Sequence, residues 1–201
     1  MTSTKTATEH STRWFDIYLA SSRWKRFAYR LAPKQYKAGA VLRTALQRIG
    51  ILRESGHEHL NGSIVVPLYG ELGDDGAPPH VVGAYGRKLL DNLRVGTPKH
   101  LYLPGPHRGV LNREGLEGEG EVILCEALLD ALTFWAAGYR NVTSCYGVHG
   151  MTDELLTALK TCGAQRVLIA FDRDEAGDRG AEAVAKQLMP EGLECFRLLF
   201  P

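Results

Sequence analysis

Residues 121–130 read EVILCEALLD and residues 167–177 read VLIAFDRDEAG, and these two stretches decide the fold. Each carries a short apolar run that turns abruptly into carboxylates. Apolar runs of this length suit strands buried on both faces, as in a parallel sheet. A helical pattern follows each run, so we predict that both acidic groups lie where a strand ends and a helix begins. In open α/β sheets, ligands bind at that edge.

The spacing of the acids favours one shared site. Asp172 and Asp174 are two residues apart, so in an extended segment they point the same way, whereas Glu126 and Asp130 are four apart and share a helix face. If the two strands are neighbours, these carboxylates converge, and their repulsion calls for a cation or protons. Oxygen ligands without a nearby His or Cys favour Mg²⁺ or Mn²⁺. The alternative is that these acids only begin a loop and cap a helix.

The same residues resemble a known family. LCEALLDAL at 124–132 and AFDRDEAG at 170–177 look like the two signature motifs of the TOPRIM domain, which bacterial-type DNA primases, topoisomerases and certain nucleases share. The Asp-x-Asp-x-Ala-Gly form is most similar to the primase branch, and VTSCYG at 142–147 matches a primase strand that ends in a Gly-containing turn. The resemblance implies an α/β fold with a TOPRIM-type, mainly parallel sheet flanked by helices, preceded by a smaller basic α+β subdomain.

The resemblance also implies roles for individual residues. Glu126, Asp172 and Asp174 would be catalytic, and together with Asp130 they would hold Mg²⁺ or Mn²⁺. Further upstream, IVVPL at 64–68, VGAYGR at 82–87, PKHL at 98–101 and HRG at 107–109 look like the primase strand pair and its basic loops. Carried over, the cations that face nucleotide and template are Arg87, Lys99 and Arg108. Taken without the resemblance, these three are surface loop cations.

The implied function is that of a DNA primase-like nucleotidyltransferase in DNA replication, which copies a DNA template into a short RNA primer by two-metal phosphoryl chemistry. The expected partners are a single-stranded DNA template and NTPs, with a replicative helicase as a further candidate. Two alternatives stay open, a TOPRIM-type metal-dependent nuclease and a non-catalytic nucleic-acid-binding accessory protein. No P-loop motif occurs, which argues against a helicase motor within the chain.

The composition and the charge distribution indicate where the protein acts and which partners it has. The net charge is +1, but residues 1–60 hold 11 Lys and Arg against 4 Asp and Glu, so the first third is basic beside an acidic remainder. No apolar run approaches the ~20 residues that span a bilayer, and the N-terminus lacks a secretory core, so we expect a cytoplasmic protein without a membrane partner. The four cysteines form no Cys-x-x-Cys pair, so no zinc is expected.

The domain organisation follows from these patterns. We expect a disordered tail at 1–12, a basic α+β primase-core subdomain at 13–115 and a TOPRIM domain at 120–201. Aromatic and basic residues at Trp14–Leu31 predict one or two amphipathic helices. The zinc-binding and helicase-interacting regions of the family have no counterpart, so we expect a fragment, a degenerate copy, or a subunit of a mobile-element or phage replication system.

Overall fold

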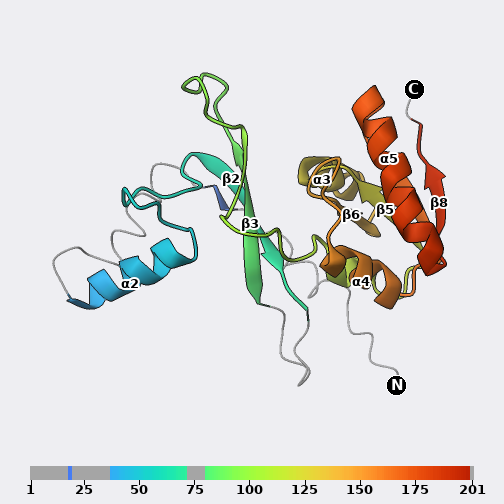
Figure 1. Ribbon diagram of the computed structural model, residues 1–201, viewed down its shortest axis with the longest axis horizontal. Helices are drawn as coiled ribbons and strands as arrows, with labels where there is room; N and C mark the ends of the chain where they lie inside the picture. Colours follow the sequence, from blue (N-terminus) through green and yellow to red (C-terminus); the bar gives the residue numbers. More distant parts are fainter. Residues whose placement is uncertain (1–17, 20–36, 72–79, 200–201) are drawn as a thin grey trace, which may run out of the picture. The chain divides into compact units, whose positions relative to one another are not determined.

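The computed structural model describes residues 18–19, 37–71 and 80–199, and these fall into two compact units (Figure 1). Unit 1 contains the described residues up to Leu68 together with Val81–Pro106, and unit 2 contains the other described residues. The predicted tail at 1–12 and all of Trp14–Leu31 except Tyr18–Leu19 lie outside the described residues. The predicted domain boundaries stay predictions.

Unit 1 is built on an antiparallel sheet with the strand order β1-β2-β3-β4. Its elements are β1 (Tyr18–Leu19), α2 (Lys37–Arg48), β2 (Ser63–Tyr69), β3 (Val81–Lys88) and β4 (His100–Tyr102). The helical prediction was wrong at β1, where Tyr18 pairs with Val65 and Leu19 with Ile64. This pairing gives the outer backbone groups of β2 hydrogen-bond partners, a long-range gain that local helical periodicity does not reveal.

Unit 2 is an α/β unit whose four-stranded sheet has the order β6-β5-β7-β8 with every pair parallel. The strands are β5 (Glu121–Cys125), β6 (Val142–Ser144), β7 (Arg166–Ala170) and β8 (Glu194–Arg197). The helices are α3 (Leu128–Ala136), α4 (Asp153–Thr161) and α5 (Glu175–Leu188), with 3₁₀ turns at Arg113–Leu116 and Met189–Glu191. The predicted mainly parallel sheet flanked by helices is confirmed. The apolar runs Val122–Cys125 and Val167–Phe171 predict its two central strands, and β5 and β7 match those bounds to within one residue at each end.

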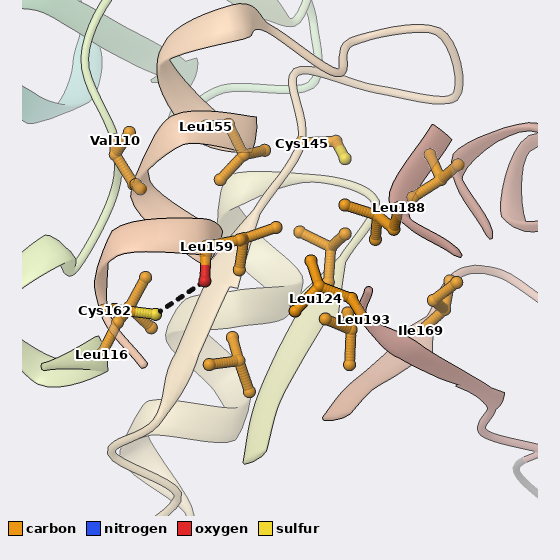
Figure 2. Packing of buried hydrophobic residues seen from close by; sticks show 14 of the residues in the cluster. Val110, Leu116, Leu124, Cys145, Leu155, Leu159, Cys162, Ile169, Leu188 and Leu193 are labelled. Atoms are coloured by element: carbon orange, nitrogen blue, oxygen red, sulfur yellow. Dashed lines mark hydrogen bonds between the residues drawn. The ribbon is translucent and has the colours of Figure 1, made fainter. Parts of the chain in front are cut away.

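One face of this sheet carries the main core of unit 2. Leu124 of β5 and Ile169 of β7 pack against Leu155 and Leu159 of α4 and against Leu188 of α5 (Figure 2). Because alternate strand residues point to opposite faces, Val122 and Val167 join this core while Ile123 faces the other way. Thr152 precedes apolar residues at Leu155, Leu156 and Leu159, a pattern that predicts a helix capped by Thr152. This is confirmed in α4, where the Thr152 hydroxyl accepts a hydrogen bond from the amide of Leu155 at 3.2 Å.

Helix α3 contributes no residue to that core cluster and packs instead on β5 and β6. The nearly all-apolar stretch at Ala127–Ala137 predicts a buried helix, but only Leu128 and Ala131 are buried. The prediction was wrong for the outer face, because a helix lying on a sheet buries only one stripe. The guanidinium of Arg140 lies 3.5 Å from the Trp135 ring centre and covers part of that outer face.

Candidate active site

The predicted acids follow two adjacent parallel strands. Cys125, the last residue of β5, is in register with Ala170, the last residue of β7. Glu126 therefore leaves the sheet directly beside the segment that leads into Asp172. The chain passes from β5 to β6 on one side and from β7 to β8 on the other, so the strand order reverses between β5 and β7. Such a switch point is where open parallel sheets bind ligands at their carboxyl edge.

Glu126 is the electrostatic centre of this edge. Its side chain is half-buried, and its Oε2 atom is buried with no hydrogen-bond partner among the described residues. Burial raises the pKa of the Glu126 carboxyl, and the neighbouring charges of Asp172, Asp174 and Asp130 raise it further. A hydrogen bond with the Asp172 backbone opposes this rise. The charges of the other three predicted acids thus all act on Glu126.

Two of these acids also cap helices. The Asp130 carboxylate accepts a hydrogen bond from the Ala127 amide at 3.2 Å, and Asp174 accepts one from the Gly177 amide at 2.7 Å. Each side chain is thereby drawn toward the first turn of its own helix. Within residues 18–19, 37–71 and 80–199, no three His, Cys, Asp or Glu side chains are gathered into a group that could hold a metal ion. The capping contacts give a physical reason, since they turn Asp130 and Asp174 toward backbone amides.

The donor set nevertheless fits a hard divalent cation. Carboxylate oxygens are the ligands that Mg²⁺ and Mn²⁺ prefer, and the buried Oε2 of Glu126 offers an oxygen with no protein partner among the residues described. Bringing a cation to Glu126 and Asp172 would relieve the repulsion that raises the Glu126 pKa. Rotation of the exposed Asp172 and Asp174 side chains would complete the ligand set.

A turn after β6 supports Glu126 from the other side. The Gly147 amide donates a hydrogen bond of 2.9 Å to the carbonyl oxygen of Glu126, and Gly147 takes a φ of 99° that favours glycine. The thiol of Cys145 is buried beside this turn, and burial raises its pKa to about 12, with the charge of Glu126 adding to the effect. Cys145 is therefore a neutral packing residue at neutral pH.

Tyr146 connects the same turn to the segment of Arg108. Its hydroxyl donates to the carbonyl oxygens of Arg108 at 2.7 Å and Gly109 at 2.8 Å, and its ring stacks on His107 with the centroids 4.6 Å apart. The Arg108 guanidinium lies 3.4 Å from the Glu154 carboxylate in an exposed ion pair. Arg108 is thus held by its backbone on the unit that carries the acids.

The other two predicted cations belong to unit 1. Arg87 on β3 is half-buried, and its Nη1 atom is buried without a hydrogen-bond partner among the described residues. Lys99 forms an exposed ion pair with Asp91 at 2.7 Å, which lowers the pKa of the Asp91 carboxyl. Exposed ion pairs of this kind are weak, so Lys99 remains able to bind another anion.

One residue of the site was missed by the sequence analysis. Arg197 ends β8, and its guanidinium donates to the carbonyl oxygens of Phe171 and Asp172, both at 2.8 Å, and to the carboxylate of Asp178 at 3.1 Å. The available signal was a single cation in the otherwise apolar run at 196–200. Nothing in that run indicates that the cation reaches the strand beside it.

Comparison with known proteins identifies the second unit. Residues 123–201 match the family model described as Toprim-like. The chain is 33% identical over 107 residues to the DNA primase of Campylobacter jejuni, an alignment that covers 50% of this chain and 17% of that protein. The chain spans about a fifth of the length of the curated DNA primases it matches. It therefore has DNA primase homologues and carries a Toprim-like domain.

Solved structures give the same fold. The zinc-binding and RNA polymerase domains of Aquifex aeolicus primase match with a TM-score of 0.71 and 22% identity, over 97% of this chain and 49% of that one. A DnaG primase catalytic domain bound to single-stranded DNA matches with a TM-score of 0.64 and 18% identity, over 87% of this chain and 56% of that one. At these identities the likeness shows the fold, which is that of primase catalytic cores.

Among the described residues, none of the helices has the length and apolar character needed to cross a membrane.

Proposed function

We propose that this chain carries the nucleotidyl-transfer site of a DNA primase-like enzyme, which acts in DNA replication in the cytoplasm and copies single-stranded DNA into RNA primers. Glu126 and Asp172 would hold the principal Mg²⁺ or Mn²⁺ ion, and Asp174 would help to hold a second. When bound, such ions neutralise the charge on the attacking and leaving oxygens of the transfer. Asp130 would be a peripheral ligand of the metal site, since its carboxylate already caps α3.

One observation carries the proposal. Glu126 and Asp172 follow two strands that are adjacent and parallel. The charge of Asp172 helps to raise the pKa of the Glu126 carboxyl. One oxygen of that carboxyl is buried and has no hydrogen-bond partner among the described residues. A purely structural carboxylate at such a place would gain by pairing with a donor. The arrangement instead suits a site that is completed by a cation.

The basic residues supply the second part of the proposal. Arg87, Lys99 and Arg108 would neutralise the triphosphate of the incoming NTP and the template backbone. Arg108 and Lys99 each have a carboxylate partner in an exposed ion pair. Such pairs contribute little to stability and exchange readily for phosphate, so Arg108 and Lys99 are available as charge-assisted hydrogen-bond donors to phosphate oxygens. The single-stranded DNA in the structure of the related primase domain supports a DNA template, and a replicative helicase is a further candidate partner.

The test is primer synthesis by the purified chain. Labelled NTPs, single-stranded DNA and Mg²⁺ or Mn²⁺ are supplied, and the RNA products are resolved by length. We expect NTP-dependent synthesis by the unaltered chain and by Glu182→Gln, an exposed change on the opposite side of α5 from the core. Asp172→Asn should lose synthesis by at least about 100-fold, since a metal ligand is lost, while its melting temperature should not fall.

Other outcomes separate the competing functions. Cleavage of the DNA without NTPs would replace the proposal by a metal-dependent nuclease. DNA binding without either reaction, and without specific Mn²⁺ uptake in calorimetry, would leave a non-catalytic accessory protein. Equal synthesis by the unaltered chain and Asp172→Asn would remove the proposed site.

A further inference from the structure

Arg197 donates hydrogen bonds to the end of β7, to the turn that carries Asp172 and to α5. Its Nη1 atom donates to the carbonyl oxygens of Phe171 at 2.8 Å, Leu198 at 3.2 Å and Ile169 at 3.3 Å. Its Nη2 atom donates to the Asp172 carbonyl oxygen at 2.8 Å and to the Asp178 carboxylate at 3.1 Å. The side chain is only 22% exposed. One cation on β8 therefore binds the end of β7, the turn after it and the first part of α5.

These contacts meet a local need for donors. Beyond Ala170 the chain leaves the sheet, so the carbonyl groups of Phe171 and Asp172 have no neighbouring strand to bind. Arg197 is in register with Ile169 and reaches past the strand end to these oxygens. A guanidinium presents several donors in one rigid plane, which a lysine ammonium does not. The carbonyl groups immediately before and after the Asp172 α-carbon are thereby held to β8 of the sheet.

The same contacts bear on the carboxylates. The Asp172 side chain is exposed, but its backbone is held by Arg197 on one side and by the close approach of Gly177 on the other. The Arg197 guanidinium is itself paired with the Asp178 carboxylate at 3.1 Å, so its effect on Asp172 is exerted through the backbone hydrogen bonds.

We propose that Arg197 is a positioning residue, which holds the Asp172 turn in the geometry that binds the divalent ion. This inference rests on the proposed function, because it assigns Arg197 to the same metal site. Arg197 does not itself touch the ion or the substrate. It acts through the backbone carbonyls of Phe171 and Asp172, and its loss should reduce metal affinity beyond any loss of stability.

The experiment measures Mn²⁺ affinity by calorimetry, well below the melting temperature, together with thermal melting of the metal-free chain. We expect Arg197→Met to weaken Mn²⁺ binding by about 10-fold or more, the range seen when a group that orients a metal ligand is removed. Arg197→Lys should recover part of the affinity, since it keeps the charge and one or two of the hydrogen bonds. It also keeps the test open if Arg197→Met fails to fold.

Two control variants separate positioning from general stability. Arg166→Met removes an arginine of the neighbouring strand at the opposite edge of the sheet, where its ion pair with Glu121 spans 3.6 Å. Asn112→Ala removes buried hydrogen bonds of 2.6 Å to the carbonyls of Arg140 and Val142, and should lower the melting temperature. Both should bind Mn²⁺ within about twofold of the unaltered chain, since neither contacts the Asp172 turn.

The outcomes are distinct. Unchanged Mn²⁺ affinity in Arg197→Met, or in Arg197→Lys where only that variant folds, overturns the positioning role and leaves the proposed function standing. An equal loss of affinity in Asn112→Ala also overturns it, since the effect would follow stability alone. Absence of specific Mn²⁺ binding by the unaltered chain removes the proposed metal site and this inference with it.

Discussion

Gly177 approaches Asp172 so closely that a β-carbon at position 177 would lie 2.1 Å from the Asp172 carbonyl oxygen. The neighbouring atoms are backbone, which cannot move aside as a flexible side chain can. Gly177 is also the residue whose amide binds the Asp174 carboxylate. The first turn of α5 is thus packed directly against the turn that carries both acids, and a glycine is required there by space and not by a left-handed φ.

Gly177→Ala should therefore disturb stability and metal binding together. Relieving the contact requires a shift of the Asp172 backbone, and we expect a loss of roughly 1–3 kcal/mol in the free energy of unfolding, the range for overpacking. Urea titration and Mn²⁺ calorimetry measure the two effects. Gly120→Ala is the control, because nothing lies within 4 Å of a β-carbon there. Native stability in Gly177→Ala would contradict the close packing described.

Asp174 has two separable roles. Asparagine caps helices about as well as aspartate, so Asp174→Asn should leave the melting temperature unchanged while weakening Mn²⁺ binding through the lost charge. Asp174→Ala should weaken binding and also lower the free energy of unfolding by about 1 kcal/mol, through loss of the cap. Melting curves and calorimetry on the pair decide this. Full Mn²⁺ affinity in Asp174→Asn would exclude Asp174 as a ligand.

The raised pKa of Glu126 predicts a pH-dependent stability. The folded chain binds the Glu126 proton more tightly than the unfolded chain, so the stability from this group is present below the ordinary carboxyl pKa and is lost as pH rises through the raised value. Glu126→Gln is neutral throughout. In EDTA it should melt a few degrees higher than the unaltered chain near neutral pH, and the difference should shrink toward about pH 4.

Glu121→Gln is the control for that measurement, since Glu121 begins the same strand at its other end. It should show no comparable gain near neutral pH. Adding Mn²⁺ should raise the melting temperature of the unaltered chain and not that of Glu126→Gln, because a ligand that binds the folded state stabilises it. If Glu126→Gln melts at a lower temperature than the unaltered chain in EDTA at neutral pH, the ionised Glu126 carboxylate stabilises the fold, and the prediction is wrong.

The Tyr146 hydroxyl is predicted to hold the Arg108 segment. Tyr146→Phe keeps the ring that stacks on His107 but removes the donor to two carbonyl oxygens. We expect a loss of about 1 kcal/mol in the free energy of unfolding, together with a raised KM for NTP if Arg108 contacts the triphosphate. Tyr139→Phe, on an exposed tyrosine outside this turn, is the control. Unchanged stability and KM in Tyr146→Phe would mean that the hydroxyl contacts contribute nothing.

Local patterns predicted much of unit 2. The apolar runs that became β5 and β7 are recognisable because a strand buried on both faces must be apolar throughout, and the alternation of α4 and α5 with these strands fits a parallel sheet. The acids at the strand ends were found for the same reason, since a carboxylate directly after such a run stands out. The type of a helix or strand and its approximate bounds can be predicted because they depend mainly on residues that are close together in the sequence.

Other features had no local signal. The pairing of Tyr18–Leu19 with β2 joins residues more than 40 positions apart, and an aromatic, basic stretch gives no sign of it. The half-exposed outer face of α3 was hidden by uniform apolar composition, since composition does not say which stripe meets the sheet. The capping bonds of Asp130 and Asp174, which draw these acids away from a ready ligand cluster, depend on side-chain torsions.

The sequence by itself determined that two buried strands end in carboxylates, because an apolar run followed directly by acidic residues is a pattern of neighbouring residues. Only the tertiary structure decided that β5 and β7 are neighbours, that Glu126 faces the charge of Asp172, and that Arg197 holds the turn that follows β7. The physical reason is that sheet hydrogen bonds and guanidinium contacts join residues distant in the chain. The energy of such a contact depends on which strands are neighbours in the fold, and the residues that precede and follow each partner in the sequence do not reveal it.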